Sequence, residues 1–307
     1  MLMSRPVAEG PGQAPGLASG QAMSEIVRSP GYWATVWRRV LRDPVAVGAA
    51  LVILAIVLIA ILAPYIAPQD PYKGMTLRRL RPPGTEGFPL GTDELGRDML
   101  SRLIFGARLS LFMGVTPVIL ALFLGSAIGI AAGYAGGWVN SILMRTIDVF
   151  FAFPSVLLAI ALSGALGAGV LNGLISLTVV FIPPIARVAE SVTTSVRSRD
   201  YVEAARASGA GPLTIVRVQV LGNVMGPIFV YGMSLVAVSM ILASGLSFLG
   251  LGVKPPEPEW GLMLNTLRTA IYTQPLLCAL PGVMIFVTSI SFNMLTDGLR
   301  SAMDIKA

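Results

Sequence analysis

The residues best suited to chemistry in this sequence lie in a short polar stretch, residues 201–211, between long apolar runs. Asp200 can cap a helix that begins near Tyr201, and Glu203 then falls in the first turn, where an acidic group suits the helix dipole. Alanines favour the helix, and Gly209 predicts its end. Small side chains beside one acid suit docking into a groove of another protein. Resting on lipid headgroups is the alternative, and these residues alone leave both open.

Residue types elsewhere argue against catalysis. The chain of 307 residues has no His, and its single cysteine, Cys278, lies in an apolar run. Because His is the commonest general base and metal ligand, we expect neither a catalytic nor a metal site. The sequence also lacks the G-x-x-x-x-G-K-[ST] pattern, so this chain cannot itself cradle phosphates in a P-loop. We therefore expect no enzyme activity, no cofactor in this chain and, without a basic cluster among aromatic residues, no nucleic-acid partner.

The composition predicts an integral membrane protein. Hydrophobic residues make up 54% of the chain and charged residues 12%, about half the charged share of a soluble domain. The mean hydropathy is +0.76. Charge-free runs of this length predict an all-α fold with six transmembrane helices. The expected spans lie near residues 45–63, 109–132, 141–163, 170–189 and 224–244, and between residues 268 and 297.

Prolines and charges mark the ends and bends of these spans. Pro154 and the pair Pro183–Pro184 predict kinks in the third and fourth spans. Arg145 and Asp148 stand three residues apart at an expected membrane edge. That spacing favours a local ion pair over a buried proton relay.

Three glycines mark one face of the second span. Gly125, Gly129 and Gly133 recur every four residues, so a helix places them on the same side. Small residues at this spacing let another helix approach closely, although the spacing does not say which helix.

The N-terminal part divides into a tail, a surface helix and an anchor. Residues 1–30 are rich in Gly, Pro, Ala and Ser and predict a disordered tail. Residues 33–42 hold two Trp and three Arg, which suits a helix on the membrane surface. The first span begins too late and runs too long for a cleaved signal peptide, so we expect a retained signal anchor.

The polar segment before the second span ends in a turn that opens a helix. Residues 91–102 combine glycines with acids at 93 and 94, and Thr92 or Asp93 can act as the cap. With six spans and an inside N-terminus, more Lys and Arg residues fall inside than outside. This weak bias places residues 190–217 in the cytoplasm.

Four ordered motifs carry a resemblance to a known family. Glu203, Ala204 and Ala205, followed after three residues by Gly209, resemble the EAA loop of ABC importer permeases. Three further stretches resemble the peptide/nickel subfamily, of the dipeptide and oligopeptide permease C type. These are Gly91-Thr-Asp-x-x-Gly96-Arg97-Asp98 with Ser101-Arg102, then Leu246-Ser-Phe-Leu-Gly-Leu-Gly252 with Pro255, Pro256, Trp260 and Gly261, and last Phe292-Asn293 with Asp297-Gly298-Leu299-Arg300. The resemblance extends over residues 33–304.

The resemblance implies a type I (MetI-like) permease fold with a cytoplasmic coupling helix. In that helix Glu203, Ala204, Ala205, Arg206 and Gly209 would dock on an ATPase. The expected partners are a second, homologous permease subunit, two ATPase subunits that bind ATP and Mg, and a solute-binding protein outside. The expected activity is ATP-driven import of di- or oligopeptides, or a similar solute, across the cytoplasmic (inner) membrane by alternating access.

The same resemblance implies a domain map. Residues 31–68 would form the surface helix and first span, and residues 69–108 an extracytoplasmic segment. Residues 109–304 would form the permease domain, with a coupling loop at about 190–222. Both termini would be cytoplasmic.

Two positions depart from the family pattern. Gly222 stands where the EAA loop usually has proline, so we expect a looser return into the fifth span. Ala243 stands where many relatives carry Glu, which puts in doubt any role borrowed from that charge.

Two other classes remain alternatives. A stand-alone secondary transporter would need ionisable residues within spans or an inverted repeat, and a membrane enzyme would need paired catalytic groups. Neither pattern is evident. The solute itself stays open among peptides, nickel chelates, glutathione-like and opine-like compounds.

Overall fold

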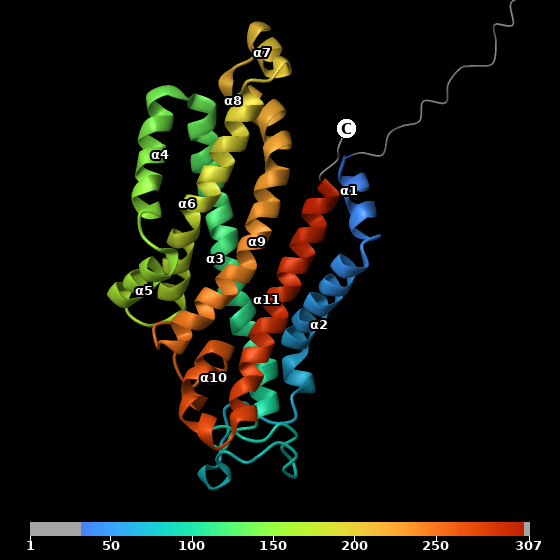
Figure 1. Cartoon of the computed structure of the whole chain (residues 1–307), viewed down its shortest axis with the longest axis vertical. Helices are drawn as coiled ribbons and strands as arrows, with labels where there is room; N and C mark the ends of the chain where they lie inside the picture. The colour runs from blue at the N-terminus through green and yellow to red at the C-terminus, as the bar shows by residue number, and fades with distance from the viewer. Residues whose placement is uncertain (1–31, 304–307) are drawn as a thin grey trace, which may run out of the picture.

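The structure, a computed structural model, describes residues 32–303 (Figure 1). The expected disordered tail, residues 1–30, lies outside the described residues. Within the described part the regular elements are helices, with no β-strand, so the predicted all-α class is confirmed.

Within residues 32–303, five helices are long and apolar enough to cross a membrane. These helices are α2 (Pro44–Ile66), α3 (Met99–Ala135), α6 (Val170–Arg197), α9 (Leu221–Phe248) and α11 (Pro275–Met303). Each of the first four contains one of the predicted charge-free runs and extends beyond it, whereas α11 begins inside the sixth run, after a 3-10 turn at Arg268–Tyr272.

The third predicted span is broken into two helices. The α4 helix (Gly137–Phe151) and the α5 helix (Ser155–Leu166) together pass as one apolar span, but they are bent by 85°. Pro154 is the N-cap of α5 and disfavours a helical conformation in the residue before it. The predicted kink is therefore a break. The α6 helix, by contrast, runs through Pro183 and Pro184 without interruption.

Shorter helices lie at the two ends of the bundle (Figure 1). The α10 helix lies at the lower end, and α7 and α8 project from the upper end. The α1 helix packs on the last turns of α11 through Val36, Val40 and Ala302. The bounds are α1 (Tyr32–Val40), α7 (Asp200–Ala207), α8 (Pro212–Ile215) and α10 (Trp260–Leu267).

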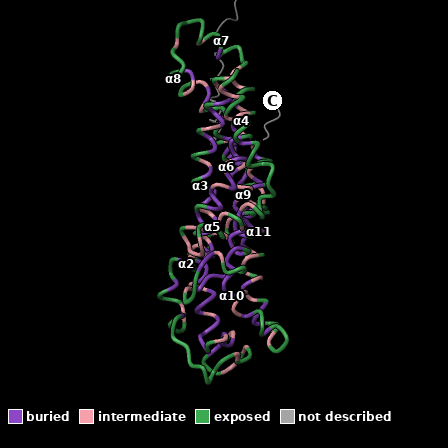
Figure 2. The backbone as a smooth tube through the Cα atoms, turned by 90° about the vertical axis from the view of Figure 1, so that its left-hand side faces the viewer, coloured by how far each residue is buried: buried purple, intermediate pink, exposed green. Residues whose placement is uncertain are grey.

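The α3 helix forms the centre of the bundle and packs most extensively against α6 and α9. Buried backbone runs along these inner helices, and exposed backbone gathers at the ends (Figure 2). Large apolar side chains also remain exposed, among them Phe123 on α3 at 74% and Trp138 on α4 at 74%. Exposure of this kind suits contact with lipid.

A buried polar cluster closes the α10 end of the bundle. The Asp93 carboxylate pairs with Arg97 Nε at 2.6 Å and lies 3.2 Å from Arg102 Nε. Arg102 Nη1 also donates to the carbonyl of Pro71. This network holds the segment before α3 against the helix ends.

The helix that opens in this segment begins later than its predicted caps. Asp98 caps α3 by accepting from the Ser101 amide at 2.8 Å. Thr92 and Asp93, the expected caps, lie in the preceding loop, where the Asp93 carboxylate accepts from the Leu95 and Arg97 amides. That carboxylate already has partners, so it is not free to cap a helix.

Candidate functional site

The α7 helix forms the candidate docking segment at the upper end of Figure 1. Its N-cap is Arg199, whose carbonyl accepts from the Val202 and Glu203 amides. Asp200, the expected cap, is the first helical residue instead and makes no capping bond. Its charge still lies in the first turn with Glu203, where it favours the helix dipole.

One side of α7 is anchored and the other is open. Val202 is fully buried and Ala205 is half-buried against the core cluster. Glu203, Ala204 and Arg206 are exposed. The helix thus presents Asp200, Glu203 and Arg206 and a small alanine surface to the outside, with Tyr201 as its one exposed large side chain.

The C-terminus of α7 has the geometry of a Schellman motif. The Gly209 amide donates to the Arg206 carbonyl at 3.1 Å, and the Ala210 amide donates to the Ala205 carbonyl at 3.1 Å. Gly209 has φ +83°, a left-handed conformation that favours glycine. No atom outside its immediate neighbours lies within 4 Å of the position of an added Cβ. Gly209 is therefore required by the backbone, and its surroundings are open.

The return into the fifth span is continuous. The α8 helix leads into a π-helical turn, η2 (Val216–Val220), and then directly into α9. Gly222 lies inside the first turn of α9, and the Asn223 side chain bonds back to the Gln219 carbonyl at 2.7 Å. The expectation of a looser turn at Gly222 is wrong, because a helix takes the place of the turn.

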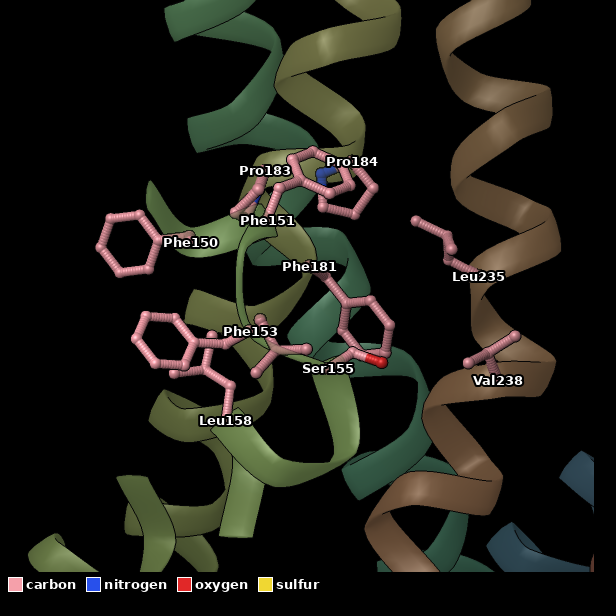
Figure 3. A pocket seen from close by; sticks show the side chains of 11 residues that line it. Phe150, Phe151, Phe153, Ser155, Leu158, Phe181, Pro183, Pro184, Leu235 and Val238 are labelled. Atoms are coloured by element: carbon pink, nitrogen blue, oxygen red, sulfur yellow. The ribbon is translucent and has the colours of Figure 1, made fainter. Parts of the chain in front are cut away.

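The break between α4 and α5 borders an apolar cavity of about 270 Å³. Its walls come from three places: the break itself, α6 and α9 (Figure 3). Leu235 and Val238 point from α9 toward Phe181. The other lining residues are Phe150, Phe151, Phe153, Ser155, Leu158, Val180, Pro183 and Pro184.

The sequence reading missed this aromatic cluster. Its signal was present in Phe150, Phe151 and Phe153, three aromatic residues directly before Pro154. An aromatic run at a predicted break indicates bulky side chains gathered where a helix changes direction. The cavity has no charged lining residue, and Ser155 is the one polar residue in its lining.

Polar contacts tie α4 to α6 above this cavity. Asn140 Nδ2 donates to Glu190 Oε1 at 2.7 Å. One turn before the break, Asp148 forms an ion pair with Arg187 of α6. The predicted partner of Asp148, Arg145 on the same helix, is therefore wrong. Because both side chains of the pair are about half exposed, the contact is also not a buried relay.

The glycine face of α3 lies against α6. A Cβ on Gly129 would stand 2.3 Å from the Ala186 carbonyl, and one on Gly133 would stand 2.7 Å from the Glu190 carbonyl. Gly125 meets Ile182 and Ile185 in the same way. The sequence did not identify the partner helix; in the structure it is α6.

Ala243, the second position that departs from the family pattern, is buried within α9.

Two family descriptions match the chain. Residues 125–306 match the binding-protein-dependent transport system inner membrane component, and residues 31–83 match the N-terminal transmembrane domain of oligopeptide transport permease C. Relatives are similar along nearly the whole chain. A glutathione transport system permease protein from Pectobacterium atrosepticum is 40% identical, covering 91% of this chain and 92% of the relative. A di/tripeptide transport system permease protein from Pseudomonas aeruginosa is 40% identical, covering 88% and 91%.

These matches cover both the anchor and the helical bundle, and the observed helices follow the type I (MetI-like) permease fold. In such systems the permease is not an enzyme, and ATP hydrolysis belongs to other subunits. The chain therefore belongs to the binding-protein-dependent transport system inner membrane component family and is a membrane-embedded permease subunit of an ABC importer.

Proposed function

We propose that this permease imports small peptides, with di- and tripeptides or glutathione as the solute class. The observation that carries this proposal is the 40% identity, over about nine-tenths of the chain, to permeases named for these two cargoes. Glutathione is itself a tripeptide, so both cargoes share amide bonds and charged termini. These two relatives are named for peptide cargoes rather than for nickel-chelate or opine-like compounds.

The exposed side of α7 is the surface that would dock on the ATPase. Glu203, Ala204, Arg206 and Gly209 are accessible there, whereas Ala205 supports the helix from its inner side. After the turn at Gly209, α8 and η2 lead without a gap into α9. A push on α7 would therefore reach the part of α9 that borders the aromatic cavity.

The translocation path would run beside the α4–α5 break. The cavity walls come from the break, α6 and α9, and a second, homologous permease subunit would supply the other half. In this arrangement the α7 end and both termini face the cytoplasm, and the α10 end faces a solute-binding protein. Residues 109–304 would form the permease domain, residues 190–222 the coupling loop, and residues 69–108 the extracytoplasmic segment.

The solute is tested by uptake. Cells that express the chain with its neighbouring transport genes should accumulate labelled dipeptide or glutathione, and unlabelled dipeptide should compete. If unlabelled peptide does not reduce uptake and a compound of another class does, small peptides are not the cargo.

Docking is tested separately from cargo. Ala204→Arg places a long cation on the exposed side of α7 and should abolish uptake while the protein level in the membrane stays normal. Ser301→Arg, on an exposed position in the last turn of α11 and outside the coupling loop, is the matched control and should transport normally. Full ATP-driven uptake by the Ala204 variant would exclude this docking surface.

A further inference from the structure

A groove of about 560 Å³ runs along the outside of the bundle, between α2, α3 and α11. It lies across the bundle from the aromatic cavity and shares no lining residue with it. One lining residue, Arg108, is charged, and no acidic residue borders the groove. The remaining lining residues are Val57, Ala60, Ile61, Leu111, Phe112, Val115, Thr116 and Phe292.

The position of Arg108 follows from a proline on the neighbouring helix. Pro64 lies inside α2 and has no amide hydrogen, so the Ala60 carbonyl four residues earlier lacks its helical partner. Arg108 Nε donates to this carbonyl at 2.6 Å, and its Nη2 donates to the Ile61 carbonyl at 3.0 Å. The guanidinium also lies over the Phe105 ring, 5.3 Å from the ring centre. The side chain is thus fixed rather than free to swing into water.

These contacts leave part of the guanidinium unused. Nη1 has no hydrogen-bond partner among the described residues, and no carboxylate pairs with Arg108 there. The residue is exposed on the outer side of the bundle, beside the last two turns of α2. A guanidinium at this depth is costly unless an anion or water meets it.

The groove also has a direction. The charged end lies at Arg108, toward the α10 end of the bundle, and Thr116 lies eight residues further along α3, about 12 Å deeper at 1.5 Å per residue. Between them the surface is apolar. An occupant must therefore carry an anionic group at one end and a hydrocarbon chain at the other.

We propose that this groove binds a membrane phospholipid, with its phosphate on Arg108 and an acyl chain along α3. Arg favours phosphate because its planar group offers paired donors. The bound lipid would fill the space between α2 and the bundle and fasten the anchor helix to α3. This site is independent of the cargo and of docking at α7.

Native mass spectrometry of the full-length chain, purified with its co-expressed subunits, tests the proposal. After mild delipidation, added phosphatidylglycerol should remain bound to the wild type. Arg108→Gln should retain it about ten-fold less, the effect of losing one charge-assisted contact. Arg268→Gln removes an exposed Arg at the same end and should retain lipid like the wild type. Glycerol phosphate, which has no tail, should not compete.

A second variant separates lipid loss from misfolding. Val115→Trp fills the groove, leaves Arg108 in place and should lower retention as well. Equal retention by the wild type and both groove variants would overturn the proposal. A photo-reactive residue placed at position 112 gives a second test. A crosslink to another polypeptide instead of to phospholipid would also overturn the proposal, because the groove would then be a subunit interface.

Discussion

Asp148, in the last turn of α4, pairs with Arg187 on α6 just before the break between α4 and α5. The pair lies one turn from the aromatic cavity, and α6 continues from Arg187 to the α7 segment. It therefore links the broken span to the helix that carries the candidate docking segment. Together with the bond between Asn140 and Glu190, it fixes α4 while α5 turns away.

We expect the two charges to be coupled energetically. Asp148→Asn or Arg187→Gln alone leaves the other charge unpaired at an apolar surface, so each should lower the melting temperature and the uptake rate. The double variant should lose less than the sum of the single losses, with a coupling of about 1 kcal/mol because the pair is half exposed. Strictly additive losses would show that the pair contributes nothing.

The choice of Arg187 over Arg145 shows where sequence reading stops. Spacing along one helix reveals only partners three or four residues apart. The partner of Asp148 lies 39 residues further along the chain and becomes adjacent only when α4 folds back on α6. The predicted cap of α3 at Asp93 is wrong for a related reason, because the Asp93 carboxylate pairs with Arg97 and Arg102 instead.

The sequence was sufficient for features with strong local signals. Charge-free runs predicted the membrane helices, and Pro154 predicted the disturbance of the third span. The 85° bend itself depends on packing against α6 and could not be read from the residues. The Arg108 groove was likewise out of reach, because it joins α2 to α3 through a carbonyl that Pro64 leaves unpaired.

Gly129 should be intolerant of any side chain. An alanine Cβ there would lie 2.3 Å from the Ala186 carbonyl and 2.6 Å from the Ala189 Cβ, so α3 and α6 must separate. We expect Gly129→Ala to destabilise the protein by about 1–3 kcal/mol, measured as a lower melting temperature in detergent. Gly48→Ala, where no atom lies within 4 Å, is the matched control and should be neutral or slightly stabilising. Equal melting of the two variants would contradict the close packing of α3 on α6.

Glu259 should make stability depend on pH. This carboxyl is 1% exposed at the start of α10, and burial raises its pKa, opposed by hydrogen bonds from the Gly261 and Leu262 amides and the Ser247 and Ser110 hydroxyls. A raised pKa means that the folded protein holds this proton more tightly than the unfolded chain. The contribution of Glu259 to stability is therefore fully present below the pKa of the unfolded chain. It is lost as pH rises through the pKa of the folded protein.

Glu259→Gln isolates that contribution. The amide cannot ionise and keeps one oxygen for the α10 amides. Melting curves at a series of pH values should show the melting temperature of the variant rising relative to that of the wild type as pH increases from about 4.5. Glu86→Gln, on the exposed loop at the same end, should follow the wild type throughout. A constant difference between Glu259→Gln and wild type at all pH values would mean that Glu259 does not titrate in this range.

Gly209 should be needed for its backbone conformation. At φ +83° an alanine is strained by about 1–2 kcal/mol, whereas asparagine adopts this region more readily. Gly209→Ala should weaken the bonds from the Gly209 and Ala210 amides, and amide hydrogen exchange at both positions should accelerate. Gly211→Ala is the control, because Gly211 has φ −68° and free space around it.

The substitutions at Gly209 also separate conformation from contact. If α7 docks through a smooth surface, Gly209→Asn should preserve slow exchange and yet impair uptake, because its side chain projects from the exposed end of the helix. If Gly209 serves only to end the helix, Gly209→Asn should transport normally while Gly209→Ala does not. Unchanged exchange in Gly209→Ala would contradict both, since it would mean that the Schellman bonds do not depend on a left-handed glycine.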